Sequence, residues 1–355
     1  MTSPVISLRQ LLLKSTLKTE RTSPECQKSR SLKLDTLPDC AAEFVRRYFA
    51  GALMSAELVE SFATICNDQP EVATYVFASS LRRNFPLRSS YERKVLKTLV
   101  GIFERSNMEV PNEIFEAIGE CMVDAGSTSH RIFFNRLNEY VVIRENNQQL
   151  SLGTTGLSCW QASCHLANLL SLIDLSGKTI VELGAGCGLT GISVASWQLV
   201  KHACLTDFDP NVLAQLNHNI LLNSERTGNR VSVETVDFLN YCSEKTPLVA
   251  DVVVGADIVY DCSILSGLTK TIFEILSRKK SSFCLIASAL RNETTLEYFD
   301  KALEGHGLMV LESAQIRKDR VEFDEDCSFS LPPFFPFSAS VDCPTVVYLI
   351  VRRDI

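Results

Sequence analysis

Apolar residues recur at intervals of three and four between residues 39 and 125, which is the spacing that places side chains on one face of an α-helix. Pro111 and Asn112 stand just ahead of one such set, in positions typical of a helix start. The sets are Phe44, Val45, Tyr48 and Phe49; Val95, Leu99, Ile102 and Phe103; and Ile114, Phe115, Ile118 and Met122. We predict a helical domain over residues 39–137, either a module that reads a substrate or partner or a scaffold packed on the rest of the chain.

The pattern changes after residue 138. Residues 140–144 and 149–152 read as the two arms of a β-hairpin. From Gly153 onward, strand-like runs alternate with helical segments, and a long irregular stretch separates the last two runs. The runs are residues 179–183, 202–206, 231–236, 251–255, 283–287, 308–313 and 346–351. This alternation predicts an α/β domain over residues 138–355, with a largely parallel sheet covered on both faces and ligands at the carboxyl ends of its strands.

The amino terminus allows two interpretations. Arg9, Lys14 and Lys18 precede the first acidic residue, Glu20, with serines and threonines between them, which resembles an organelle transit peptide. The alternative is a short helix over residues 6–13, followed by a basic stretch whose Ser, Thr, Pro and Lys content cannot bury a core. We favour the second interpretation and expect a flexible segment over residues 1–38.

Composition excludes several classes of protein. The content of 46% hydrophobic and 22% charged residues is that of an ordinary globular protein, and no apolar window reaches the length of a membrane span. A formal net charge of -7 argues against a surface built to bind nucleic acid directly. The 13 cysteines form no CxxC pair, and the histidines lack ligand spacing, so we expect no metal site, reduced thiols and a cytoplasmic location.

The strongest motif is Val-Glu-Leu-Gly-Ala-Gly-Cys-Gly-Leu-Thr-Gly at residues 181–191, where an apolar strand runs through a glycine-rich turn into a helix. Gly184 and Gly186, on either side of Ala185, remove side chains where a ligand must touch the backbone. The same stretch also satisfies a bare dinucleotide fingerprint. Glu182 decides between the two, because a glutamate ahead of three alternating glycines is typical of S-adenosylmethionine sites. The position of the turn, after a helical domain, is also unlike that in a dehydrogenase.

Acidic residues follow the next two strands. Asp207 can accept hydrogen bonds from both ribose hydroxyls of a nucleoside, and Asp209 is the second choice for this role. Asp237 can accept the adenine amine, while Phe238 can stack on the ring. Each acid alone could belong to a solvated loop. Their succession at the ends of consecutive strands favours S-adenosylmethionine as the cofactor.

The segment Ala256-Asp-Ile-Val-Tyr260 follows the fourth strand. Its Asp-x-x-Tyr pattern, together with Trp160, the glycine loop and Thr206-Asp207, resembles methyltransferase family 16, the seven-β-strand protein-lysine methyltransferases. The resemblance runs from about residue 140 to the end. It implies a seven-stranded Rossmann-like class I methyltransferase sheet with an antiparallel final pair, and it adds Trp160 and Ala256 to the cofactor site.

Three further segments narrow the resemblance. Residues 153–157, 287–294 and 110–121 resemble the branch of the family that acts on eukaryotic elongation factor 2. This implies a protein substrate, trimethylation of one lysine on that factor, and a monomeric enzyme without membrane contact. Phe238 departs from the family, which often has Trp there, but an aromatic ring for stacking remains.

The chemistry of lysine methylation fits these residues. Only the neutral amine attacks a methyl group, and for a lysine of pKa about 10.4 reaching that form at pH 7 costs about 4.6 kcal/mol. Asp257 alone would favour the ammonium form, so we expect it to bind and aim the lysine while the cofactor's positive charge encourages proton loss. Tyr260 can line the lysine channel or accept a hydrogen bond from the amine. The alternative role for Asp257 is a helix N-cap.

Other functions remain open at this point. The same fold could methylate a small molecule, a nucleic-acid base or a different protein lysine. Base methylation usually shows Asn- or Asp-Pro-Pro-aromatic after the fourth strand, where this chain has Asp257 within Ala-Asp-Ile-Val-Tyr. A non-catalytic scaffold that binds the cofactor would have no reason to keep this motif.

Aromatic residues gather in the stretch that joins the last two strands, residues 324–344. They are Phe329, Phe334, Phe335 and Phe337, interleaved with Pro332, Pro333 and Pro336. Prolines disfavour a sheet edge, so the rings are either tucked onto the protein or held out for a partner. We hypothesise that some of them contact the elongation factor beside the target lysine.

Overall fold

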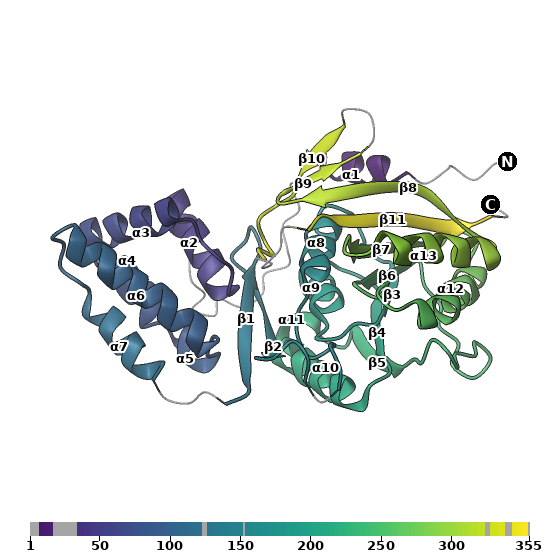
Figure 1. The fold of residues 1–355 in the computed structure, drawn as a ribbon, viewed down its shortest axis with the longest axis horizontal. Helices are drawn as coiled ribbons and strands as arrows, with labels where there is room; N and C mark the ends of the chain where they lie inside the picture. The colour runs from purple at the N-terminus through teal and green to yellow at the C-terminus, as the bar shows by residue number, and fades with distance from the viewer. Residues whose placement is uncertain are drawn as a thin grey trace. The chain divides into compact units, whose positions relative to one another are not determined.

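The computed structural model describes residues 7–16, 34–122, 126–151, 153–323, 327–337 and 343–353. These residues fall into two compact units (Figure 1). The helical unit lies within Pro24–Ser151 and Phe334–Ser338, and the sheet unit lies within Met1–Ser23, Leu152–Pro333 and Ala339–Ile355. Among the described residues, no helix is long and apolar enough to cross a membrane.

The sheet unit is built on a mixed sheet that, within the described residues, has the strand order β10-β9-β8-β11-β7-β6-β3-β4-β5. Neighbouring strands from β7 to β5 are parallel, whereas β11 is antiparallel to both β7 and β8. The strands are β3 (Thr179–Leu183), β4 (His202–Asp207), β5 (Val231–Thr235), β6 (Val252–Ala256), β7 (Phe283–Ala289), β8 (Leu308–Arg317), β9 (Arg320–Glu322), β10 (Ser328–Ser330) and β11 (Thr345–Arg352). All seven predicted strands are confirmed, and with them the predicted α/β class.

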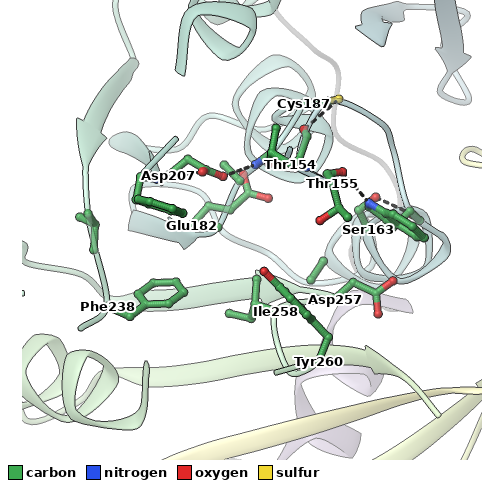
Figure 2. Close-up of a pocket in the computed structure, with 18 of the residues that line it drawn as sticks. Thr154, Thr155, Ser163, Glu182, Cys187, Asp207, Phe238, Asp257, Ile258 and Tyr260 are labelled. Carbon is green, nitrogen blue, oxygen red and sulfur yellow. Dashed lines mark hydrogen bonds between the residues drawn. The ribbon is translucent and has the colours of Figure 1, made fainter. Parts of the chain in front are cut away.

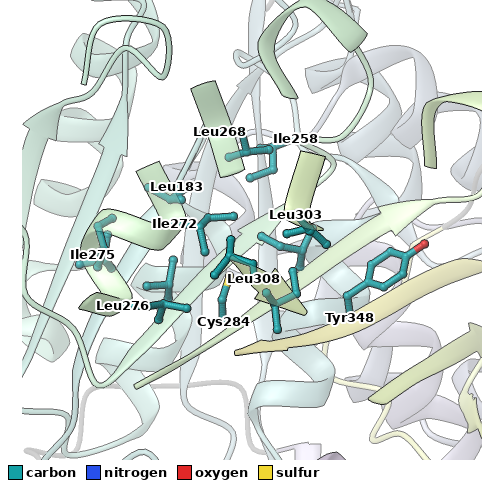
Figure 3. Close-up of a cluster of buried hydrophobic side chains, with 14 of the residues drawn as sticks. Leu183, Ile258, Leu268, Ile272, Ile275, Leu276, Cys284, Leu303, Leu308 and Tyr348 are labelled. Atoms are coloured by element: carbon teal, nitrogen blue, oxygen red, sulfur yellow. The ribbon is translucent and has the colours of Figure 1, made fainter. Parts of the chain in front are cut away.

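Helices cover both faces of this sheet, with α8 and α9 on one side and α12 and α13 on the other (Figure 1). The helices of the unit are α1 (Leu8–Thr16), α8 (Gln161–Leu170), α9 (Leu189–Trp197), α10 (Pro210–Leu222), α11 (Ser224–Thr227), α12 (Cys262–Ser277) and α13 (Glu293–Gly305). Figure 3 shows the core beneath α12, where Ile272, Ile275 and Leu276 meet Leu183 of β3 and Cys284 of β7. Burial of this apolar face fixes the strands whose ends carry the site.

The helical unit holds η1 (Leu34–Thr36), α2 (Asp39–Phe49), α3 (Ala56–Asp68), α4 (Glu71–Phe77), α5 (Ser80–Asn84), α6 (Ser89–Arg105) and α7 (Asn112–Glu120). Its first two predicted apolar sets are buried. In the third set Ile114 of α7 is buried, whereas Phe115 of α7 and Met122, just beyond the end of that helix, are exposed. Arg82 of α5 lies at the centre, with its Nε 2.5 Å from Glu92 Oε1 on α6 and a second contact to Glu120 of α7. This buried charge network links three helices.

A hairpin also belongs to the helical unit, and its arms differ from the prediction. Strand β2 (Tyr140–Asn146) pairs with β1 (Thr128–Phe134), which precedes it, and not with residues 149–151; residue 152 of the predicted arm lies outside the described residues. The turn explains the choice, because Asn135 Oδ1 accepts hydrogen bonds from the backbone N–H groups of Leu137 and Glu139. A side chain that closes a turn in this way lets the chain reverse directly after β1. The boundary predicted at residue 138 therefore falls inside the hairpin.

Two rings of the aromatic stretch are buried, and residues 324–326 and 338–342 of that stretch lie outside the described residues. Phe334 and Phe335 are only 8% and 1% exposed and group with the helical unit, where Phe335 lies 5.2 Å from Phe133 between ring centroids. These two rings are therefore not free to contact a partner, which removes them from the recognition hypothesis. A sheet edge also forms just ahead of the prolines, at β10.

The amino-terminal segment is not flexible throughout. Helix α1 begins where Glu312 of β8 accepts hydrogen bonds from the backbone N–H groups of Leu8 and Arg9, at 2.6 and 3.3 Å, and its carboxylate also pairs with the Arg9 side chain. Leu8 and Leu12 are buried. A carboxylate at a helix N-terminus satisfies unpaired amides and opposes the helix dipole. The short helix predicted over residues 6–13 forms as α1, whereas the flexible segment expected over residues 1–38 is corrected at residues 7–16 and 34–38.

We predict that Glu312→Gln loosens α1 without unfolding the sheet unit. Loss of the negative charge weakens both the cap and the pairing with Arg9, by about 1 kcal/mol in total. Amide hydrogen exchange in α1 should accelerate roughly fivefold, since this is the factor for an energy of that size. Glu304→Gln, which removes an exposed glutamate paired with Arg353, is the control. Unchanged exchange in α1 would show that Leu8 and Leu12 hold the helix alone.

Candidate active site

A cavity of about 260 Å³ opens at the carboxyl ends of β3, β4 and β6 (Figure 2). Its position matches the edge at which ligands bind in open α/β sheets. Every residue that the sequence assigned to the site lines this cavity: Trp160, Glu182, Gly184, Ala185, Gly186, Asp207, Asp237, Phe238, Ala256, Asp257 and Tyr260. The fold therefore brings together residues separated by about 100 positions in the chain.

The glycine loop passes so close to its neighbours that side chains are excluded. Gly184, Gly186 and Gly188 all have positive φ, at 59°, 56° and 83°. A Cβ on Gly186 would lie 3.1 Å from the carbonyl oxygen of Gly156, and one on Gly184 would lie 2.6 Å from Ile258 Cγ2. Both the backbone conformation and the space therefore require glycine at these positions.

Glu182, at the end of β3, is buried and accepts a hydrogen bond at 2.8 Å from the backbone N–H of Gly191 in α9. Burial raises the pKa of its carboxyl to about 8, against the lowering effect of that hydrogen bond. Glu182 thus joins the strand to the first turn of the helix that follows the glycine loop. Its carboxyl also faces the cavity.

Asp207, at the end of β4, uses both carboxylate oxygens to hold backbone. Oδ2 accepts the N–H of Gly186 at 3.1 Å, and Oδ1 accepts the N–H groups of Phe208 and Asp209 at 2.8 and 3.3 Å. Burial raises its pKa, although these hydrogen bonds favour the charged form. Asp209, the second choice, instead caps α10 by accepting from the N–H groups of Asn211 and Val212.

Asp237 and Phe238 follow β5 in a tight turn. Asp237 Oδ1 accepts the N–H of Leu239 at 3.0 Å, and Oδ2 accepts the side-chain amide of Asn240 at 2.7 Å. Phe238 is half-buried against the core, and its Cζ lies 3.9 Å from the position of a Cβ on Gly184. The ring therefore stands directly beside the glycine loop (Figure 2).

The loop before α8 forms another wall of the cavity. The indole N–H of Trp160 donates to the carbonyl oxygen of Thr155 at 3.0 Å, so the ring is fixed to its own loop. Helix α10 holds the loop from outside, because Gln215 Nε2 donates to the carbonyl oxygen of Leu157 at 3.0 Å. Trp160 itself begins α8 as its N-terminal flanking residue.

Asp257 has a backbone conformation that is rare for a residue with a side chain, with φ of 56°. It follows β6 directly, and its N–H donates to Ala287 of β7 at 2.8 Å. Its carboxylate accepts the N–H of Ala289 at 3.1 Å and a guanidinium N–H of Arg291 at 3.2 Å. The helix-cap alternative is wrong, because Asp261 caps α12 by accepting from Ser263 N–H.

Tyr260 stands at the open side of the cavity and is 62% exposed. Figure 2 shows its hydroxyl directed towards the middle of the cavity. Partial burial raises the pKa of the phenol, and the charges of Asp207 and Asp261 raise it further. The hydroxyl therefore stays protonated at neutral pH and can donate or accept a hydrogen bond.

Several residues of the site were not predicted. Phe208 and Leu239 line the cavity as exposed apolar side chains; Phe208 directly follows Asp207, and Leu239 lies in the turn that Asp237 begins. Ile258 fills the space that a side chain at position 184 would occupy. Thr154 and Thr155 also line the cavity; they belong to residues 153–157, a segment that resembles one branch of the family but for which the sequence predicted no role. Arg291 lies in another such segment, and an exposed arginine in a loop gives no pattern that a sequence reading can detect.

Comparison with known proteins now decides the class. The sequence profile described as lysine methyltransferase matches residues 104–305. The chain belongs to this family. It is an S-adenosylmethionine-dependent methyltransferase, as the glycine loop and the strand order had indicated.

Individual relatives are more distant. Two proteins named protein-lysine N-methyltransferase EEF2KMT, from Mus musculus and Homo sapiens, are each 28% identical to this chain. The alignments cover 61% and 63% of this chain and 70% and 72% of theirs. Protein-lysine N-methyltransferase EFM3 from Saccharomyces cerevisiae is 29% identical over 44% of this chain and 50% of its own.

We predict that Glu182 makes the stability of the protein fall as pH rises. The folded pKa of about 8 lies above the ordinary value of 4.5, so between these pH values the folded state holds a proton that the unfolded chain has released. The stabilisation is complete below about pH 4.5 and is lost as pH rises to about 8, by up to about 5 kcal/mol in total. Glu182→Gln cannot titrate and should lose less stability over this range.

Chemical denaturation of the cofactor-free protein at a series of pH values measures this difference. Glu234→Gln, an exposed glutamate on β5, is the control and should follow the wild type. If Glu182→Gln and the wild type gave parallel curves from pH 5 to 8, Glu182 would be ionised in the folded protein.

Proposed function

We propose that this enzyme transfers methyl groups from S-adenosylmethionine to one lysine of eukaryotic elongation factor 2 and carries that lysine to the trimethylated form. Similarity to relatives named protein-lysine N-methyltransferase EEF2KMT and EFM3 supports a protein acceptor. The segments at residues 110–121, 153–157 and 287–294, which resemble the branch that acts on this factor, support the choice of substrate.

The lining of the cavity suits the cofactor in its chemistry. Gly184 and Gly186 line the cavity with backbone alone, and a Cβ on either one would crowd Ile258 or Gly156. In the proposal, this loop holds the amino-acid part, Asp207 accepts the ribose hydroxyls, and Asp237 with Phe238 holds the adenine. The buried Glu182 maintains the loop, and Trp160 and Ala256 complete the walls. When bound, the cofactor supplies an electrophilic methyl group on a sulfonium centre.

The observation that carries the lysine assignment is the position of Asp257. Its carboxylate lies at the cavity wall, on a residue whose φ of 56° is in the left-handed region that few residues with a side chain adopt, aspartate and asparagine among them. Hydrogen bonds from Ala289 and Arg291 hold that carboxylate in one direction. In the proposal, Asp257 binds and aims the lysine Nζ, and Tyr260 lines its approach. Held there, the amine would lose its proton to water and take the methyl group that the bound cofactor would supply, with the neutral thioether as the leaving group.

We predict that Asp207→Asn weakens binding of S-adenosylhomocysteine tenfold to a hundredfold. The neutral amide gives up a charge-assisted hydrogen bond worth roughly 1.5–3 kcal/mol, while it keeps an oxygen for the loop amides. Asp209→Asn is the matched control, because it keeps the cap of α10 and should change the affinity less than twofold. Titration calorimetry measures both. Equal affinity in the two variants would move the ribose site elsewhere.

The acceptor is tested by tritiated-methyl transfer into lysate from cells that lack this protein, followed by mass spectrometry of the labelled band. We expect label on one lysine of elongation factor 2, ending in the trimethylated form. Asp257→Asn should reduce transfer at least a hundredfold and leave S-adenosylhomocysteine affinity unchanged, since asparagine tolerates the left-handed conformation. Label on a different protein or on a small molecule would replace the proposed acceptor. Cofactor affinity lost in step with activity would assign Asp257 to the cofactor site.

A further inference from the structure

Arg291 is the one cation with a recorded contact to the Asp257 carboxylate among the described residues. Its Nη2 lies 3.2 Å from Asp257 Oδ2, and the guanidinium carbon lies 5.1 Å from the centre of the Trp160 ring. Asp257 and Trp160 both line the cavity, whereas Arg291 touches them from outside the lining. The guanidinium is thus placed beside the wall where the acceptor lysine is aimed.

The backbone around Arg291 is held in place, so this position is built into the fold. The N–H of Arg291 donates to the carbonyl oxygen of Ala289 at 2.8 Å, and the N–H of Leu290 donates to Pro344 at the same distance. Ala289 in turn donates its N–H to Asp257. One short turn after β7 therefore presents both a backbone donor and a guanidinium to the same carboxylate.

The charge of Asp257 presents a conflict that Arg291 can resolve. A carboxylate beside the acceptor attracts a lysine in its ammonium form and raises the pKa of the bound amine. The reaction, however, needs the neutral amine. A guanidinium paired with that carboxylate cancels most of its field at the acceptor, while the oxygens that bind Ala289 and Arg291 each keep a second lone pair that can accept a hydrogen bond.

We infer that Arg291 is a positioning residue that neutralises Asp257, so that the bound lysine loses its proton to water within the site. This inference rests on the proposed lysine acceptor. Arg291 does not touch the reacting atoms in this scheme. It acts through Asp257, and Trp160 supports it through the face of its ring.

Other titratable groups also face the site and must be held constant in any test. Tyr260 approaches from the loop before α12, and its own pKa is raised by burial and by Asp207 and Asp261. The remaining titratable residues of the cavity lining are Cys159, Glu182, Cys187, Asp207 and Asp237. A substitution at Arg291 leaves all of them in place. A change in the pH dependence of kcat that is specific to that substitution therefore reports on the ion pair between Arg291 and Asp257.

The inference predicts a particular split between binding and turnover. In Arg291→Gln, the unpaired Asp257 should stabilise the bound ammonium form more than the transition state, in which the nitrogen carries only part of a positive charge. KM for unmethylated elongation factor 2 and kcat at pH 7.5 should both fall about tenfold, with kcat/KM changed little. The pH at half-maximal kcat should rise by about one unit. This size is expected if the Arg291 guanidinium and the acceptor amine lie roughly 6 Å apart at an effective dielectric constant of about 40.

Three comparisons make the test specific. Arg291→Lys keeps the charge and should retain most of the wild-type profile. Arg317→Gln removes an arginine of similar exposure, 56% against 50% for Arg291, from the end of β8 and should change nothing. Calorimetric binding of elongation factor 2 to the S-adenosylhomocysteine complex should be about tenfold tighter for Arg291→Gln, a measurement independent of turnover.

The outcomes separate the inference from the proposed function. If the wild type methylated no lysine, the proposed function would fail before Arg291 was considered. If the wild type methylated lysine and Arg291→Gln raised KM, or left the pH profile where it was, Arg291 would be a docking or structural contact and the inference would be overturned. Melting temperature and S-adenosylhomocysteine affinity show whether a variant has kept its fold. If Arg291→Gln has lost its fold, the inference stands only if the folded Arg291→Lys variant shows the wild-type pH profile.

Discussion

The close approach of the glycine loop to the ends of β3 and β4 determines the geometry of the whole site. The N–H of Ala185 donates to Thr206 at 2.7 Å, and that of Gly186 donates to Asp207. These contacts are possible because a Cβ on Gly186 would already crowd Gly156. The loop therefore fixes the Asp207 carboxylate on one side and the wall that holds Trp160 on the other. The charged groups around the cavity take their positions from this backbone.

The sequence allowed the sheet unit to be predicted well because its signals are local. Strands buried on both faces appear as apolar runs, and the glycines and acids that follow them stand at fixed places in the chain. The hairpin was harder, because the true partner of β2 is a run that mixes His130 and Arg131 with phenylalanines. The turn at Asn135 decides the pairing, and its effect depends on a side chain that hydrogen-bonds its own loop.

Other features arise only from tertiary packing. The raised pKa of Glu182 follows from burial beneath α9, and the left-handed conformation of Asp257 follows from its place between β6 and β7. Arg291 is an ordinary loop arginine until the fold brings it beside Asp257. Helix α1 can be read from the sequence as a short helix, but its anchor cannot, because Glu312, some 300 residues later, supplies its first hydrogen bonds. Long-range partners of this kind leave no periodic trace in the sequence.

The place of β11 has a consequence for how the chain is made. This strand, residues 345–352, lies between β7 and β8 and pairs with both, so in the described residues the two parts of the sheet are joined by a segment that is synthesised after both of them. While the ribosome still holds that segment, β7 keeps an open edge and β8 has no place in the sheet. A nascent chain in this condition presents unpaired strand edges to its surroundings. Loss of these few residues by premature termination would therefore divide the sheet through its interior. Loss of an edge strand, by contrast, would only make the sheet narrower.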